Sequence, residues 1–348
     1  MKKISLILIL TLVIAAPILF LTSSNPVSAA GPTILKFAYF MPEKRSTASG
    51  WHWWAEELEK RTNGRVKVEF YPGGTLFKVP AAIGSVIKGV ADISMISTGA
   101  SQKRLPLINV SGLVAMGFPD TIEGNYAAGD AIMALLEKFP EVRAESKDFK
   151  WLIPQQTGNY ILVSRKKVRV PGDLKGLKIG GTGAKADYVK RLGATPLNIS
   201  PPDAYMSLQR GVIDGIFMSW SQIRIYKMQE IAEYFLNFGF SMGGIPVVMN
   251  LKSYNSLPGD IKKIMKDITP KARSISIENM FKGMKAAEKG IKAKGRTIIT
   301  PNAAEKKLWE KAAEPMWDEW VARMKKRGVK EAQKMVDEWV RLRAEASK

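Results

Sequence analysis

The sequence predicts a two-lobed α/β protein, a fold class that three observations indicate. Segments with the β-branched and aromatic composition of strands alternate with segments of helical periodicity, a pattern typical of sheets with parallel strands covered by helices. The 348 residues are enough for about two domains. A glycine motif occurs once in each half of the chain, which favours two lobes of like design.

The first thirty residues predict a signal peptide. Two lysines follow Met1, an apolar stretch covers residues 4–21, and small residues dominate 26–30. We assign residues 1–29 to the signal peptide and expect a periplasmic, soluble mature protein. A lipid anchor on cysteine is excluded because the chain has none. The alternative is that the stretch stays as a membrane anchor, since a spanning helix needs about 20 residues.

The first half of the chain alternates strands with helices whose ends carry turn residues. The predicted elements are a strand at 34–40, a helix at 49–61, a strand at 66–70, a helix at 80–88 that Gly89 ends, and a strand at 93–96. The order predicts βαβ units.

The same order returns after Trp151 and predicts a second α/β unit. We expect a strand pair at 151–154 and 160–164, a strand at 177–179, helices at 185–192 and 202–210, and strands at 212–218 and 246–250.

The repeated motif links the two units. Residues 86–93 and 208–215 both start with an apolar residue and share, from their third position on, the order basic, Gly, Val, apolar, Asp. Their glycines, Gly89 and Gly211, are 122 positions apart. Each reads as a helix that ends at a glycine with positive φ and leads directly into a buried strand. We interpret the repeat as a sign of duplication.

The last eighty residues predict helices. After Pro270, residues 271–294 form a helix of about 36 Å at 1.5 Å per residue, long enough to cross both lobes. Asn302 is the expected N-cap of a further helix, and Gly328 separates it from a final helix that ends near Ser347.

Composition excludes much catalytic and metal chemistry. The chain has no cysteine and one histidine, His52, so thiolate sites and centres with two imidazoles are excluded, and a Ser-His-Asp triad would need His52 itself. Residues 180–183 (Gly-Gly-Thr-Gly) lack the ending of a nucleotide-binding loop, although their amides suit an anion. We expect no catalytic residues, no metal and no cofactor.

The charge favours anionic partners. The formal net charge is +21 and the isoelectric point is near 9.9. Because an exported protein rarely meets nucleic acid, we expect no nucleic-acid partner and favour small organic anions.

Six short segments, in order along the chain, resemble a known family. They are residues 56–74, 88–92, 157–160, 173–179, 192–196 and 208–215. With them the chain resembles the solute-binding proteins of tripartite ATP-independent periplasmic (TRAP) transporters, the DctP-like group. The resemblance implies a periplasmic binding protein fold with a helical C-terminus, which captures a small organic acid between its lobes and delivers it to the membrane permease subunits.

Two positions depart from that family. In most relatives the strand Leu-Lys-Ile ends in an arginine that binds the ligand carboxylate in bidentate fashion, and here the position is Gly180. A second common ligand contact, an asparagine, is replaced by Met218. We expect the amides of 180–183, with Lys185 or Arg224, to replace the guanidinium beside an apolar or aromatic-tolerant pocket. The candidate ligand-binding residues are Phe40, Tyr160, Gly180, Thr182, Lys185, Phe217, Met218, Trp220 and Arg224.

The lobes expected from the sequence are discontinuous. Lobe 1 comprises residues 31–155 with about 245–280, and lobe 2 comprises 156–244 with about 281–348. We expect a monomer that is not an enzyme. The alternatives are a ligand-binding module for a signalling receptor and an exported enzyme on a similar scaffold, which would convert its ligand.

Overall fold

The structure is a computed structural model that describes residues 31–41, 43, 48–181, 184–199 and 203–348. The expected signal peptide lies outside these residues. Within them, strands form two sheets. The five-stranded first sheet has the order β2-β1-β3-β10-β4. Its strands are β1 (Thr33–Ala38), β2 (Val66–Tyr71), β3 (Ile93–Met95), β4 (Phe149–Ile153) and β10 (Val247–Asn250).

The six-stranded second sheet has the order β11-β9-β5-β8-β6-β7. Its strands are β5 (Tyr160–Ser164), β6 (Lys178–Gly180), β7 (Thr195–Leu197), β8 (Gly215–Ser219), β9 (Tyr234–Leu236) and β11 (Thr297–Ile299). The expected strand pair at 151–154 and 160–164 is therefore wrong as a pair. β4 pairs with β10 in one sheet, whereas β5 pairs with β8 and β9 in the other, and the chain crosses between the sheets at 154–159.

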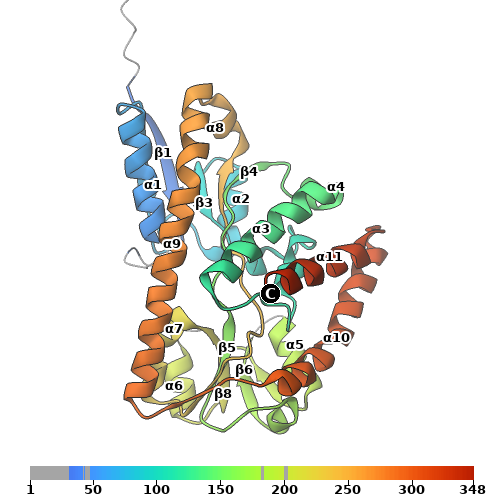
Figure 1. Cartoon of the computed structure of the whole chain (residues 1–348). Helices are drawn as coiled ribbons and strands as arrows, with labels where there is room; N and C mark the ends of the chain where they lie inside the picture. Colours follow the sequence, from blue (N-terminus) through green and yellow to red (C-terminus); the bar gives the residue numbers. More distant parts are fainter. Residues whose placement is uncertain (1–30, 42, 44–47, 182–183, 200–202) are drawn as a thin grey trace, which may run out of the picture. The chain divides into compact units, whose positions relative to one another are not determined.

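Helices cover both sheets (Figure 1). Those of the first three hundred residues are α1 (Ala48–Arg61), α2 (Ala82–Ile87), α3 (Ile122–Lys138), α4 (Pro140–Glu145), α5 (Ala184–Arg191), α6 (Ala204–Gln209), α7 (Trp220–Ile225), α8 (Leu251–Ser256) and α9 (Gly259–Ala293). Two more follow, α10 (Ala303–Lys326) and α11 (Ala332–Glu345). Asn302 caps α10 as expected, since its side chain accepts the Glu305 N–H at 2.9 Å.

The glycine motif has the same local geometry in both places. Gly89 and Gly211 have φ values of +75° and +71°, a region that favours glycine. The N–H of the next residue, Val90 or Val212, donates to the carbonyl five residues earlier, at 2.9 Å in both cases. Each copy therefore ends a helix in the same left-handed turn.

The aspartate three residues after each glycine repeats its role as well. Asp92 Oδ2 accepts the N–H of Lys36 in β1 at 2.9 Å, and Asp214 Oδ2 accepts the N–H of Lys178 in β6 at 2.8 Å. In each sheet this carboxylate holds a neighbouring strand beside the turn. This structural role explains why both copies of the motif contain an aspartate.

Helix α9 is longer than expected. It begins at Gly259, so that Pro270 lies inside the helix instead of before it, and its 35 residues correspond to about 52 Å. Proline removes one helical hydrogen bond and disfavours a helix interior. Packing outweighs this cost, because α9 buries one side against α1 and extends to α7 and β11 beside the second sheet (Figure 1).

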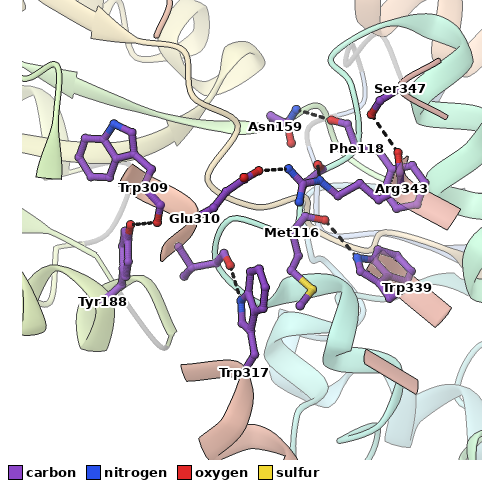
Figure 2. Close-up of polar contacts among 12 residues, drawn as sticks. Met116, Phe118, Asn159, Tyr188, Trp309, Glu310, Trp317, Trp339, Arg343 and Ser347 are labelled. Atoms are coloured by element: carbon purple, nitrogen blue, oxygen red, sulfur yellow. Dashed lines mark hydrogen bonds and ion pairs between the residues drawn. The ribbon is translucent and has the colours of Figure 1, made fainter. Parts of the chain in front are cut away.

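The C-terminal helices connect the two sheets. Near the start of α10 the Tyr188 hydroxyl, on α5, donates to the Trp309 carbonyl at 2.7 Å. Further on, α11 packs against α3, and the Trp339 indole donates to the Met116 carbonyl at 3.1 Å (Figure 2). The end of the chain thus shares a core with the first-sheet helix α3, a contact that the lobe boundaries expected from the sequence do not include.

Candidate ligand-binding cleft

A cavity of about 800 Å³ lies between the two sheets. One wall consists of residues 97–104, in the loop after β3, with Pro80, Ile83, Asn109 and Gly112. The other wall consists of residues from β5, α5 and the segment 241–243. The lining residues include Ser97, Thr98, Gly99, Ala100, Ser101, Lys103, Tyr160, Lys185, Ser241 and Met242. Ligands of α/β sheets bind beyond strand ends, which is where this cavity lies.

Lys185 supplies positive charge to the cavity. Its ammonium lies 4.3 Å from the centre of the Tyr160 ring and donates to Ser241 Oγ at 3.5 Å. No carboxylate lies within ion-pair distance of it among the described residues. Burial lowers the pKa of Lys185 to about 8 because the charged form loses solvation. An anion in the cavity would stabilise the charged form of Lys185 in place of the lost water.

The loop opposite Lys185 is fixed by hydrogen bonds. The Thr98 N–H donates to the Gly244 carbonyl at 3.0 Å, and Asn109 Nδ2 donates to the Thr98 carbonyl at 3.2 Å. A Cβ at position 244 would lie 2.4 Å from Thr98 Oγ1, so the backbone at Gly244 touches the loop directly. This wall is therefore formed before any ligand arrives.

Of the candidate residues, Tyr160 and Lys185 line the cavity. Phe217 lies beneath it and packs edge-on against Phe240 at 4.9 Å. Met218 belongs to the core on the opposite side of the second sheet, because successive strand residues face opposite sides. Phe217 and Met218 therefore face opposite sides of the sheet, and their expected role in ligand binding stays a prediction.

Gly180 is buried at the end of β6. A Cβ there would lie 2.9 Å from Cγ1 and Cδ1 of Ile216 on β8. The space that the family arginine would enter is thus partly occupied by Ile216. Thr182 lies outside the described residues.

The remaining candidates lie away from the cavity. Phe40 is half-buried against the core of the first sheet, and Arg224 is exposed on α7. Trp220 donates its indole N–H to Asp120 at 2.9 Å, beside a smaller pocket that faces α9. Neither Phe40, Trp220 nor Arg224 lines the cavity with Lys185.

The sequence predictions missed several lining residues. The run Ser97-Thr-Gly-Ala-Ser101 follows the predicted strand 93–96, and small polar residues directly after a strand are a signal for a ligand loop. Asp120 and Ser241 had no comparable signal, since long-range contacts place them.

A basic groove of about 640 Å³ adjoins the cavity, and the two share Gln102, Asn109, Gly112 and Ala184. Its charged lining residues are Asp187, Lys190, Arg191, Glu319, Arg323 and Arg327. Within the described part of the chain, we find no cluster of metal-ligating side chains and no helix long and apolar enough to cross a membrane.

Two sheets joined by crossing segments, with a cavity lined from both sides, define a two-lobed binding protein. The model of the family described as bacterial extracellular solute-binding protein, family 7 (DctP) matches residues 37–324. The chain belongs to this family.

Relatives of known structure share the fold. A TRAP periplasmic solute-binding protein from Desulfovibrio salexigens superposes with a TM-score of 0.81 at 27% identity, over 90% of this chain and 97% of that one. One from Rhodoferax ferrireducens, in complex with copurified benzoate, gives 0.77 at 25% identity, over 90% and 98%. The C4-dicarboxylate-binding periplasmic protein DctP of Rhodobacter capsulatus is 26% identical over 91% of this chain and 94% of that protein.

Proposed function

We propose that this protein captures a small organic acid in the cavity between its lobes and delivers it, unaltered, to the membrane subunits of a TRAP transporter. The observation that carries the proposal is the Lys185 ammonium, which faces the cavity without a carboxylate partner among the described residues. Relatives that bind benzoate and C4-dicarboxylates support an organic acid as the ligand class.

Lys185 takes the place of the family arginine in this proposal. The carboxylate accepts a hydrogen bond from the ammonium, with Ser241 and the Tyr160 ring on either side. A lysine is a point charge without the planar fork of arginine, so it fixes the carboxylate's orientation less strictly. Ile83, Tyr160 and Met242 supply apolar surface for the rest of the ligand.

The lobe division remains part of the proposal. We propose that lobe 1 contains the first sheet and that lobe 2 contains the second, with closure around residues 154–159 and 237–246. The packing of α11 against α3 favours motion of the last helix with lobe 1.

Mass spectrometry of the small molecules released from the purified protein tests the function. We expect an organic acid, and saturation at 100 times its dissociation constant should stabilise the fold by about 2.7 kcal/mol. Conversion of the acid during incubation would instead support the enzyme alternative. Retention of a neutral compound and no thermal shift with any acid would refute the proposal.

A further inference from the structure

The basic groove lies between α5, α10 and the segment 102–113. Four of its lining residues are cations and two are acids, and one pair, Arg191 and Glu319, already forms an ion pair at 2.5 Å. Lys190 and Arg323 are exposed and have no carboxylate within ion-pair distance among the described residues. The groove therefore carries excess positive charge.

Glu145, which lies near the fourth cation, Arg327, does not remove this excess of positive charge. Its carboxylate accepts hydrogen bonds from the N–H groups of Leu107 and Ile108 at 2.7 and 3.0 Å. Burial raises the pKa of Glu145 to about 7, so this acid is only partly ionised at neutral pH.

The groove leads to Lys185. It shares Gln102, Asn109 and Ala184 with the cavity, and Ala184 is the neighbour of Lys185 on α5. Lys190 and Arg191 follow on the same helix about one and a half turns later. Positive side chains thus lie in the groove and in the cavity that adjoins it.

Exposed cations contribute little to the energy of a bound state because water and salt screen them. A concave surface with an excess of one charge nevertheless raises the local concentration of oppositely charged solutes, and charged clefts can increase association rates by about 10- to 1,000-fold. We propose that the basic groove is the entry path on which the organic acid is captured before it reaches Lys185. The inference rests on the proposed function for its ligand.

Stopped-flow tryptophan fluorescence with benzoate or succinate, whichever stabilises the wild type, tests the path. Lys190→Gln with Arg323→Gln should slow association about three- to tenfold at 0.01 M ionic strength and leave the dissociation rate unchanged. The matched control is Lys306→Gln with Lys307→Gln, which removes two exposed charges from another part of α10. Equal slowing in both variants would overturn the proposal, because overall net charge would then explain it.

A second measurement needs no ligand. Since the chain has no cysteine, Gln102→Cys places a single thiol in the groove, and Ser256→Cys places one on α8 as a reference. We expect the thiol at 102 to favour a dianionic aromatic disulfide over a neutral one relative to the thiol at 256. The Lys190→Gln and Arg323→Gln pair should reduce this preference at least threefold, and 1 M salt should abolish it.

The two tests separate the two claims. If no organic acid shifts the thermal unfolding but the thiol preference is present and depends on Lys190 and Arg323, the proposed ligand class fails and the anion-attracting groove stands. If an acid binds but the preference is absent, or is unaffected by the two substitutions, the groove proposal fails alone.

Discussion

The indole Nε1 of Trp220 donates a 2.9 Å hydrogen bond to Oδ2 of Asp120, a residue 100 positions earlier in the chain. Trp220 begins α7, which follows the second sheet, and Asp120 precedes α3 beside the first sheet. The other carboxylate oxygen accepts the N–H of Asn159 on the crossing segment. One carboxylate thus joins both sheet regions and the segment 154–159 that connects them.

Trp220→Phe should destabilise the fold by about 1–3 kcal/mol at pH 7, because it removes the indole donor from the buried Asp120 carboxylate, which keeps only the longer hydrogen bond from the Asn159 N–H. Urea unfolding followed by circular dichroism measures the change. Trp317→Phe is the control for loss of an indole, since its N–H donates to a backbone carbonyl, that of Val114, at 2.9 Å. Equal costs in the two variants would contradict a special role for the carboxylate.

Asp120 predicts a pH dependence of stability. Burial raises its pKa to about 6, so the folded protein binds this proton more tightly than the unfolded chain does. This group therefore favours folding increasingly as pH falls from about 6 to about 4, and the gain is lost as pH rises through 6. We would measure the unfolding free energies of the wild type and of Asp120→Asn at pH 4, 5, 6 and 7. The value for the wild type should rise relative to that of Asp120→Asn as pH falls. Parallel profiles would show that Asp120 ionises normally.

The contact of α1 with α9 depends on Gly50. A Cβ at this position would lie 2.1 Å from the Ala272 carbonyl oxygen and 2.2 Å from Ser276 Oγ. We expect Gly50→Ala to cost about 1–3 kcal/mol or more, as overpacking does. Gly290→Ala is the matched control on α9, where a Cβ meets no atom within 4 Å, and it should stabilise by about 0.5–1 kcal/mol. Thermal unfolding of both variants measures the contrast.

Gly180 and Ile216 should be energetically coupled. Gly180→Ala places a methyl group 2.9 Å from the Ile216 side chain, whereas Ile216→Ala removes the two nearest of the three atoms that it would meet. We expect the double variant to be less destabilised than the sum of the single changes, by about 0.5–3 kcal/mol. Additive costs would show that Ile216 moves aside freely.

Local patterns predicted the order of the elements well. The end of α1 and the start of β2 follow from helical spacing and from the turn at Thr62-Asn63-Gly64. Both signals are properties of neighbouring residues. Strand pairing is not local, and so β4 and β5 were joined although they belong to different sheets. The start of α9 was missed for a related reason, because packing against α1 outweighs the preference of Pro270 for a helix end.

Two of the candidate residues lie at element ends that line the cavity, and their contact with a ligand stays a prediction. Tyr160 is the first residue of β5 and Lys185 is the second residue of α5, and such ends meet at the edge of a sheet. Phe217 and Met218 are consecutive residues of β8, so strand alternation places them on opposite faces of the sheet. The contact of Lys185 with Ser241 joins residues 56 apart, and no local pattern in the chain indicates it.

The most direct test of the central claim is calorimetric titration, between pH 6 and pH 10, of the organic acid that co-purifies with the protein. With a Lys185 pKa of about 8 in the free protein, affinity should be constant below pH 8 and fall as pH rises above it. Lys185→Arg should bind across the whole range, and Lys185→Met should bind about 10- to 150-fold more weakly at pH 7, the loss of one charged hydrogen bond of about 1.5–3 kcal/mol. Wild-type affinity in Lys185→Met, with an unchanged pH profile, would contradict the account.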